Sequence, residues 1–167
     1  MTHSRGEPAR LPRSSGDPRA ETLTIKVFRC ATAGFSSGET DCWNVGFQAL
    51  GAAVSPDEAG PLFGEFYGFA RALVATSRRP LSFWPLTCRG LCGDEALALL
   101  MIEQAQRANP TGVLAAAAAL LGADELGDAL QATQSLATSL ARRGLFLCAP
   151  APAEACGFDL CPMRRLN

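Results

Sequence analysis

Cysteine is the residue type in this sequence that offers the most chemistry. Seven cysteines occur in 167 residues, which exceeds ordinary intracellular use but stays below the density of a disulfide scaffold. They are Cys30, Cys42, Cys88, Cys92, Cys148, Cys156 and Cys161. Because their number is odd and no apolar stretch near the N-terminus predicts a secretory signal, we do not expect a disulfide framework.

Two cysteine pairs could supply four thiolates to one metal site. Cys88 and Cys92 enclose Arg-Gly-Leu, and Cys156 and Cys161 enclose Gly-Phe-Asp-Leu. The single histidine, His3, lies in the N-terminal segment, so the ligands would all be sulfur, as in tetrahedral zinc sites and iron–sulfur clusters. Zinc knuckles mostly place two residues between paired cysteines, so a redox-sensing thiol pair and inert, buried cysteines stay open as alternatives.

Other catalytic chemistry has little support in the sequence. A single histidine excludes Ser-His-Asp and Cys-His arrangements, and no glycine-rich phosphate-binding loop is present. Three acidic pairs stand at predicted helix starts, where capping and the helix dipole explain them, and two further acids are expected on exposed helix faces. These acids are Asp57/Glu58, Asp94/Glu95, Asp124/Glu125, Glu65 and Glu103. We therefore identify no catalytic residue in the sequence, and its composition and motifs do not favour an enzyme.

Composition narrows the class of partner. Apolar residues make up 48% of the chain, and 15 Lys and Arg nearly balance 16 Asp and Glu. The sequence therefore has no excess of basic residues that would attract nucleic acid or an anionic membrane. The longest apolar stretch, Val113–Leu121, is far shorter than the roughly 18–20 residues that cross a bilayer. We expect a cytoplasmic protein that binds neither nucleic acid nor membrane.

The chain divides into a body and two terminal segments. Residues 1–21, rich in Pro, Ser, Gly and Arg, are expected to be a disordered tail, and residues 149–167 an irregular, cysteine-containing tail. Within the body, 22–148, alternating apolar residues predict a short strand over 23–28, with 145–147 as its partner. Residues 43–50 form a short element of undetermined type.

Helical signals dominate the rest of the body. Ser55 and Pro56 start a helix, apolar residues follow at helical spacing, and Pro80 lies beyond its end. Similar signals, with Thr111 and Asp124 as caps, predict three more helices. The four predicted helices span 56–78, 93–108, 111–121 and 124–143, with the second central to the core. The fold class is thus mainly α, one domain of about four packed helices with a minor strand component.

Function follows from these features as an expectation. The helices are weakly charged, and five consecutive alanines occupy 115–119. They predict an accessory or regulatory protein that binds another protein through its helical surface, with a homodimer as one form of that binding. The alternative is a zinc or iron–sulfur protein of metal or redox metabolism, whose ligands are Cys88, Cys92, Cys156 and Cys161.

Overall fold

The computed structural model describes residues 17–38 and 40–148. These residues form six helices and no strand, so the class is all-α, with two helices more than predicted. The helices are α1 (Pro18–Ser37), α2 (Thr40–Ala53), α3 (Pro56–Thr76), α4 (Gly93–Gln106), α5 (Pro110–Leu121) and α6 (Gly127–Ala141).

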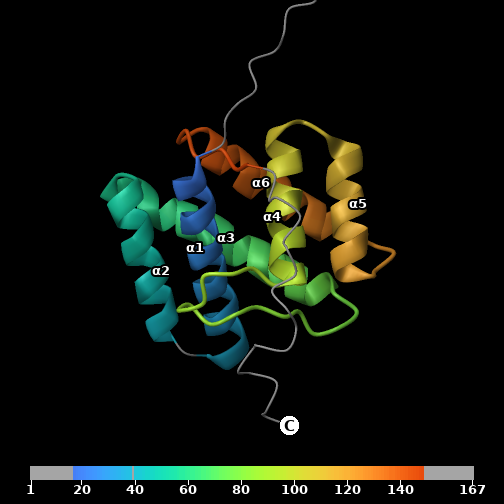
Figure 1. The fold of residues 1–167 in the computed structure, drawn as a ribbon, viewed down its shortest axis with the longest axis horizontal. Helices are drawn as coiled ribbons and strands as arrows, with labels where there is room; N and C mark the ends of the chain where they lie inside the picture. Colours follow the sequence, from blue (N-terminus) through green and yellow to red (C-terminus); the bar gives the residue numbers. More distant parts are fainter. Residues whose placement is uncertain (1–16, 39, 149–167) are drawn as a thin grey trace, which may run out of the picture.

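The helices stack in two layers (Figure 1). In the front layer α2, α1, α4 and α5 stand side by side, and α3 and α6 cross behind them. The α1–α2 pair packs on α3, and α4 packs on both α5 and α6. α3 and α6 also pack along each other, which joins the two halves behind the front layer.

The predicted strand over 23–28 is wrong, because these residues lie inside α1. Asp17 begins the helix by accepting a 2.8 Å hydrogen bond from the backbone N–H of Arg19, and Pro18 is its first residue. Ala20, Val27 and Ala31 are buried at helical spacing. The boundary expected after residue 21 therefore falls within a helix.

The partner strand predicted over 145–147 is also wrong. This segment forms hydrogen bonds with the side chain of Gln106 and with the start of α1. The side chain of Gln106 donates to the carbonyl of Leu145 at 2.8 Å and accepts from the backbone N–H of Leu147 at 2.9 Å. The carbonyl of Phe146 accepts from the backbone N–H of Asp17 at 3.1 Å.

The later helices agree with prediction except at their ends. Asn109, not Thr111, caps α5 by accepting a hydrogen bond from the backbone N–H of Gly112 at 3.1 Å. Asp124 does not begin α6, which starts at Gly127. The carboxylate of Asp124 pairs with Arg78 instead. The undetermined element over 43–50 is part of α2. In the part of the chain the structure describes, no helix is long and apolar enough to cross a membrane.

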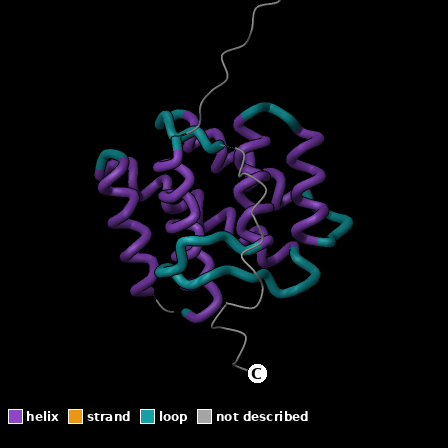
Figure 2. The backbone as a smooth tube through the Cα atoms, in the orientation of Figure 1, coloured by secondary structure: helices purple, strands orange, loops and turns teal. Residues whose placement is uncertain are grey.

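One long loop interrupts the helices. Residues 77–92 connect α3 to α4 without helical structure and cross the front of the molecule, as Figure 2 shows. This loop carries Cys88 and Cys92, so its shape decides what these two residues can do.

Candidate functional site

A buried ion pair holds the loop 77–92 in place. The guanidinium of Arg29, on α1, forms two hydrogen bonds to the carboxylate of Glu95, on α4, at 2.7 and 2.9 Å. Arg29 is 3% exposed and Glu95 is fully buried. Burial alone would lower the pKa of Arg29, but the hydrogen bonds and charge of Glu95 raise it, so the guanidinium stays charged.

The same two side chains also bind the loop backbone. The remaining Arg29 donors reach the carbonyls of Cys88 at 2.7 Å, Gly90 at 2.6 Å and Pro85 at 3.3 Å. Glu95 accepts from the backbone N–H groups of Trp84 and Cys92, both at 2.9 Å. We call Arg29, Glu95 and these backbone groups the clamp. The clamp therefore holds the loop in shape. Because the side chains of Arg29 and Glu95 form their hydrogen bonds within the protein, they are not available to bind a ligand.

A second carboxylate fastens the start of the loop. Asp94 binds the guanidinium of Arg79 at 2.8 and 2.5 Å and accepts from the backbone N–H of Ser82 at 2.7 Å. Burial would raise the pKa of Asp94, but the bonds from Arg79 and Ser82 outweigh it and lower that pKa below its ordinary value of 3.8. The acidic pair Asp94/Glu95 therefore does more than cap α4, since it shapes the loop.

The clamped loop presents two half-buried thiols. The thiol of Cys92 donates to the carbonyl of Ser82 at 3.1 Å, and burial raises its pKa to about 11, so it is protonated at neutral pH. In the described part of the chain, no group of three or more His, Cys, Asp or Glu side chains is arranged to hold a metal ion. Cys156 and Cys161 lie outside the described residues. The four-thiolate site remains a prediction.

The other described cysteines are free thiols. Cys30 is buried between α1 and α2, where a Cβ added at Gly46 would lie 2.9 Å from the Cys30 Cβ. Burial raises the pKa of Cys30 to about 11. Such a thiol packs as a small apolar group and has little nucleophilic character.

One acid contradicts the expectation of an exposed helix face. Glu103, on α4, is fully buried. Its carboxylate pairs with Arg107 one turn later and accepts from the side-chain amide of Gln104 at 2.5 Å. Glu65, by contrast, lies partly exposed on α3, at the edge of a groove.

That groove runs between α3 and α6. It consists of two adjoining hollows of about 410 and 570 Å³ that share Ala75, Thr76 and Asp128. Short side chains line it along both helices, at Gly68, Ala72, Ala75 and Ala132. We call this feature the α3–α6 groove.

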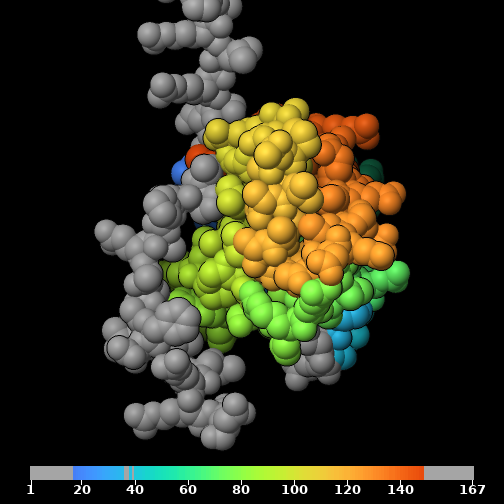
Figure 3. All heavy atoms as spheres, turned by 90° about the vertical axis from the view of Figure 1, so that its right-hand side faces the viewer, coloured from blue at the N-terminus to red at the C-terminus, as the bar shows by residue number. Residues whose placement is uncertain are grey.

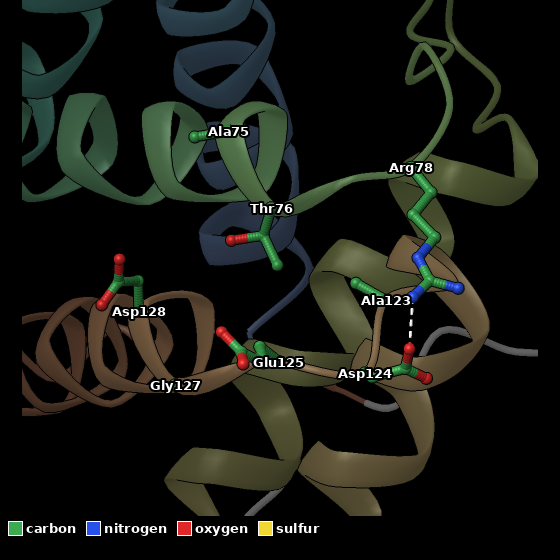
Figure 4. Close-up of a pocket in the computed structure, with 8 residues that line it drawn as sticks. All are labelled: Ala75, Thr76, Arg78, Ala123, Asp124, Glu125, Gly127 and Asp128. Atoms are coloured by element: carbon green, nitrogen blue, oxygen red, sulfur yellow. Dashed lines mark hydrogen bonds and ion pairs between the residues drawn. The ribbon is translucent and has the colours of Figure 1, made fainter.

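The polar lining of the groove contains more acidic than basic side chains. Figure 4 shows Glu125, Asp128 and the hydroxyl of Thr76 around the space between α3 and the start of α6. Asp124 is occupied by its ion pair with Arg78. Within the described residues, no ion pair involves Glu65, Glu125 or Asp128. Their charges remain available to a ligand.

Sequence reasoning identified neither the clamp nor the groove. The clamp joins residues 66 positions apart, which no local pattern reveals. The groove left one signal in α3, where Gly68 is exposed in the helix interior. Glycine is unfavourable in a helix interior, and at Gly68 the missing side chain keeps the groove open.

Comparison of the chain with family models, curated proteins and solved structures gives no match.

Proposed function

We propose that this chain is a cytoplasmic accessory or regulatory protein that binds a basic segment of a partner protein in the α3–α6 groove. The observation that carries the proposal is the combination of a lining of short side chains with a rim of unpaired carboxylates. The groove lies between two helices, where a chain segment can be held along its length.

Charge selects the kind of segment. Glu65, Glu125 and Asp128 line the groove without an ion pair in the described structure, and Arg71 is the one lining cation besides the paired Arg78. A segment that carries Arg or Lys would therefore meet complementary charge. Exposed ion pairs contribute only about 0.2–1 kcal/mol each, so we expect moderate affinity and an association rate that falls as salt increases.

The short side chains supply the space. Gly68 is exposed in the interior of α3, and a Cβ added there would meet no atom within 4 Å. Folding of the isolated chain therefore does not require glycine at this position. Because this position carries no side chain and lines the groove, another backbone can approach α3 closely there.

Fluorescence anisotropy with two synthetic peptides tests the proposal. The probe is a labelled peptide of alternating Arg and Ala, and the control peptide alternates Glu and Ala. We expect the Arg peptide to bind, more weakly as salt increases, and the Glu peptide not to bind. Equal binding of both peptides, or binding of neither, would overturn the proposal.

Variants locate the binding to the groove. Glu125→Gln/Asp128→Asn should weaken binding of the Arg peptide by about tenfold, because two carboxylates lose their charge. Asp41→Asn/Asp57→Asn removes two exposed acids at the starts of α2 and α3, outside the groove lining, so it is the matched control and should bind as the native chain does. A similar loss in both variants would mean that net charge, not the groove, determines binding.

The alternative function is a zinc or iron–sulfur accessory protein with Cys88, Cys92, Cys156 and Cys161 as ligands. It is supported by the clamp, which holds the carbonyls of Pro85, Cys88 and Gly90 and the N–H of Cys92. The half-buried, protonated thiol of Cys92 opposes it, since a metal must displace that proton. Elemental analysis and visible absorption of the purified protein test it. Metal content that is unchanged in Cys156→Ser/Cys161→Ser would exclude this ligand set.

A further inference from the structure

Two segments of the chain lie outside the described residues, and only one of them carries an excess of charge. Residues 1–16 contain three arginines and one glutamate, which gives a net charge of +2. Residues 149–167 contain two arginines and two acids, so they are neutral overall. The arginines of the first segment are Arg5, Arg10 and Arg13. A basic segment of the kind proposed for the partner is therefore present in the chain itself.

The complementary surface is the acidic rim of the α3–α6 groove. The two helices run antiparallel, since Arg143, beyond the end of α6, pairs with Glu58 at the start of α3. Glu65 therefore lies toward one end of the groove, and Glu125 and Asp128 lie at the other. In Figure 3, orange atoms near the start of α6 lie above green atoms near the end of α3, and both groups are at the surface. The acidic rim is thus open to a basic segment.

The first segment joins the described chain beside the end of α6. The backbone N–H of Asp17 donates to the carbonyl of Phe146 at 3.1 Å, and the backbone N–H of Leu145 donates to the carbonyl of Leu140 at 3.0 Å. Leu140 lies in the last turn of α6, so the start of α1 and the end of α6 are neighbours, as Figure 1 shows. Because α6 rises about 1.5 Å per residue, these contacts place Asp128 within about 30 Å of Asp17.

The length of the segment decides which arginines can meet the groove. An extended backbone covers at most about 3.3–3.6 Å per residue. Arg10 stands seven residues before Asp17 and Arg5 stands twelve, so their backbones can lie up to about 24 and 40 Å from it. Arg13 stands four residues before Asp17 and can lie only about 14 Å away. Length therefore favours Arg5 and Arg10 as the groups that meet the carboxylates.

We infer that residues 1–16 dock in the α3–α6 groove of the same chain, with Arg10 toward Glu65 and Arg5 toward Glu125 and Asp128. The segment then occupies the site that a partner's basic segment would take, so the inference rests on the proposed function and adds a form of regulation to it. A partner must displace the segment before it can bind.

The docked state should be only partly populated. Exposed ion pairs are weak, but a short linker gives the segment an effective concentration in the millimolar range. Weak attraction at a high effective concentration leaves both the docked and the free state populated. We therefore expect the segment to weaken partner binding by about twofold to fivefold.

Amide hydrogen exchange of the full chain tests the docking without any added ligand. The first N–H groups of α6 have no side-chain cap, since the N-cap residue is Leu126, so they exchange readily unless something covers them. Exchange over 125–130 should be about twofold to fivefold slower in the native chain than in Arg5→Gln/Arg10→Gln. Arg164→Gln/Arg165→Gln removes the same charge from the other segment, so it is the matched control and should exchange as the native chain does.

Peptide binding tests the competition. In fluorescence anisotropy, the labelled peptide of alternating Arg and Ala should bind Arg5→Gln/Arg10→Gln about twofold to fivefold more tightly than the native chain. Arg164→Gln/Arg165→Gln gains the same net negative charge and should bind the peptide as the native chain does. An equal gain in both variants, or no gain in either, would overturn the competition.

The outcomes separate this inference from the proposed function. Equal exchange in the native chain and Arg5→Gln/Arg10→Gln would overturn the inference, even if the peptide binds in the groove. Slower exchange in the native chain, with no peptide binding to any variant, would support the docking and overturn the proposed function. Slower exchange that depends on protein concentration would overturn the inference, since the segment would then dock on a second copy.

Discussion

The clamp and the α3–α6 groove both contain charged side chains, but they use charge in opposite ways. In the clamp, Arg29 and Glu95 are buried, paired and bonded to the loop backbone. In the groove, Glu125 and Asp128 are exposed and form no ion pair within the described structure. A satisfied, buried pair fixes structure, whereas unpaired charge at a concave surface is available for binding.

The difference also explains why the clamped loop is a weaker candidate for chemistry than its cysteines indicate. A buried charge has a high desolvation cost, and the clamp offsets that cost through bonds to five loop groups. Those bonds fix the backbone at Cys88 and Cys92, and they use the nearby hydrogen-bonding groups of Arg29 and Glu95. In the groove, Glu65, Glu125 and Asp128 form no ion pair within the described residues, so their charges are available to another molecule.

Breaking the clamp should have the largest effect. In Arg29→Met, Glu95 keeps its burial but loses its partner, so we expect a loss of about 3–5 kcal/mol in the free energy of unfolding. Chemical denaturation monitored by circular dichroism measures this loss. Arg29→Met/Glu95→Leu removes both charges and should recover part of the stability. A loss below about 1 kcal/mol in the single variant would show that the pair is not a structural requirement.

The sequence predicted the helices that have local start signals and one clearly apolar face. α3 is the best case, because Ser55 and Pro56 mark its start and Leu62, Phe66 and Phe69 form its buried row. α1 was mistaken for a strand because it packs against helices on several sides. Apolar residues on more than one face gave an alternation that resembles a half-buried strand, although Asp17 and Pro18 were a valid helix start.

The candidate sites depended on long-range packing, which a single sequence does not reveal. Glu95 was predicted as a helix-start acid, and it is one, but its partner Arg29 lies 66 positions away, directly after the segment mistaken for a strand. No local pattern in the sequence links the two residues. The groove needs α3 and α6 to pack along each other, although both helices were predicted separately.

A smaller effect is expected at Asp94, and it should depend on pH. The folded-state pKa of Asp94 lies below its ordinary value of 3.8, so its ionised form stabilises the fold above that pH, and this stabilisation is lost as pH falls through the folded-state pKa. Asp94→Asn should cost about 1–2 kcal/mol at neutral pH, since the negative charge that faces Arg79 is lost and one of the two acceptor oxygens becomes an NH2 group. The difference from the native chain should shrink as the pH falls below 3.8 and through the folded-state pKa of Asp94.

Thermal unfolding across this pH range measures the Asp94 effect. Asp57→Asn is the control, because Asp57 stands at the start of α3 and forms no ion pair within the described residues. If the loss of stability in Asp94→Asn stays constant down to pH 2, the charge of Asp94 does not account for its contribution to the stability of the fold.

The smallest expected effect on stability is a gain, at Gly68 in the groove. Gly68→Ala should stabilise the chain by about 0.5–1 kcal/mol, because alanine favours the helix and its Cβ meets no atom within 4 Å. The same methyl group enters the groove, so we expect weaker binding of the Arg peptide.

Gly51→Ala is the matched control for this change, since Gly51 is also helical with no atom within 4 Å of an added Cβ, but lies on α2 away from the groove. It should stabilise the chain similarly and leave peptide binding unchanged. Chemical denaturation and fluorescence anisotropy on the same preparations give both quantities. If Gly68→Ala gains stability and still binds the peptide like the native chain, the backbone of α3 is not a contact surface and the glycine has no role in binding.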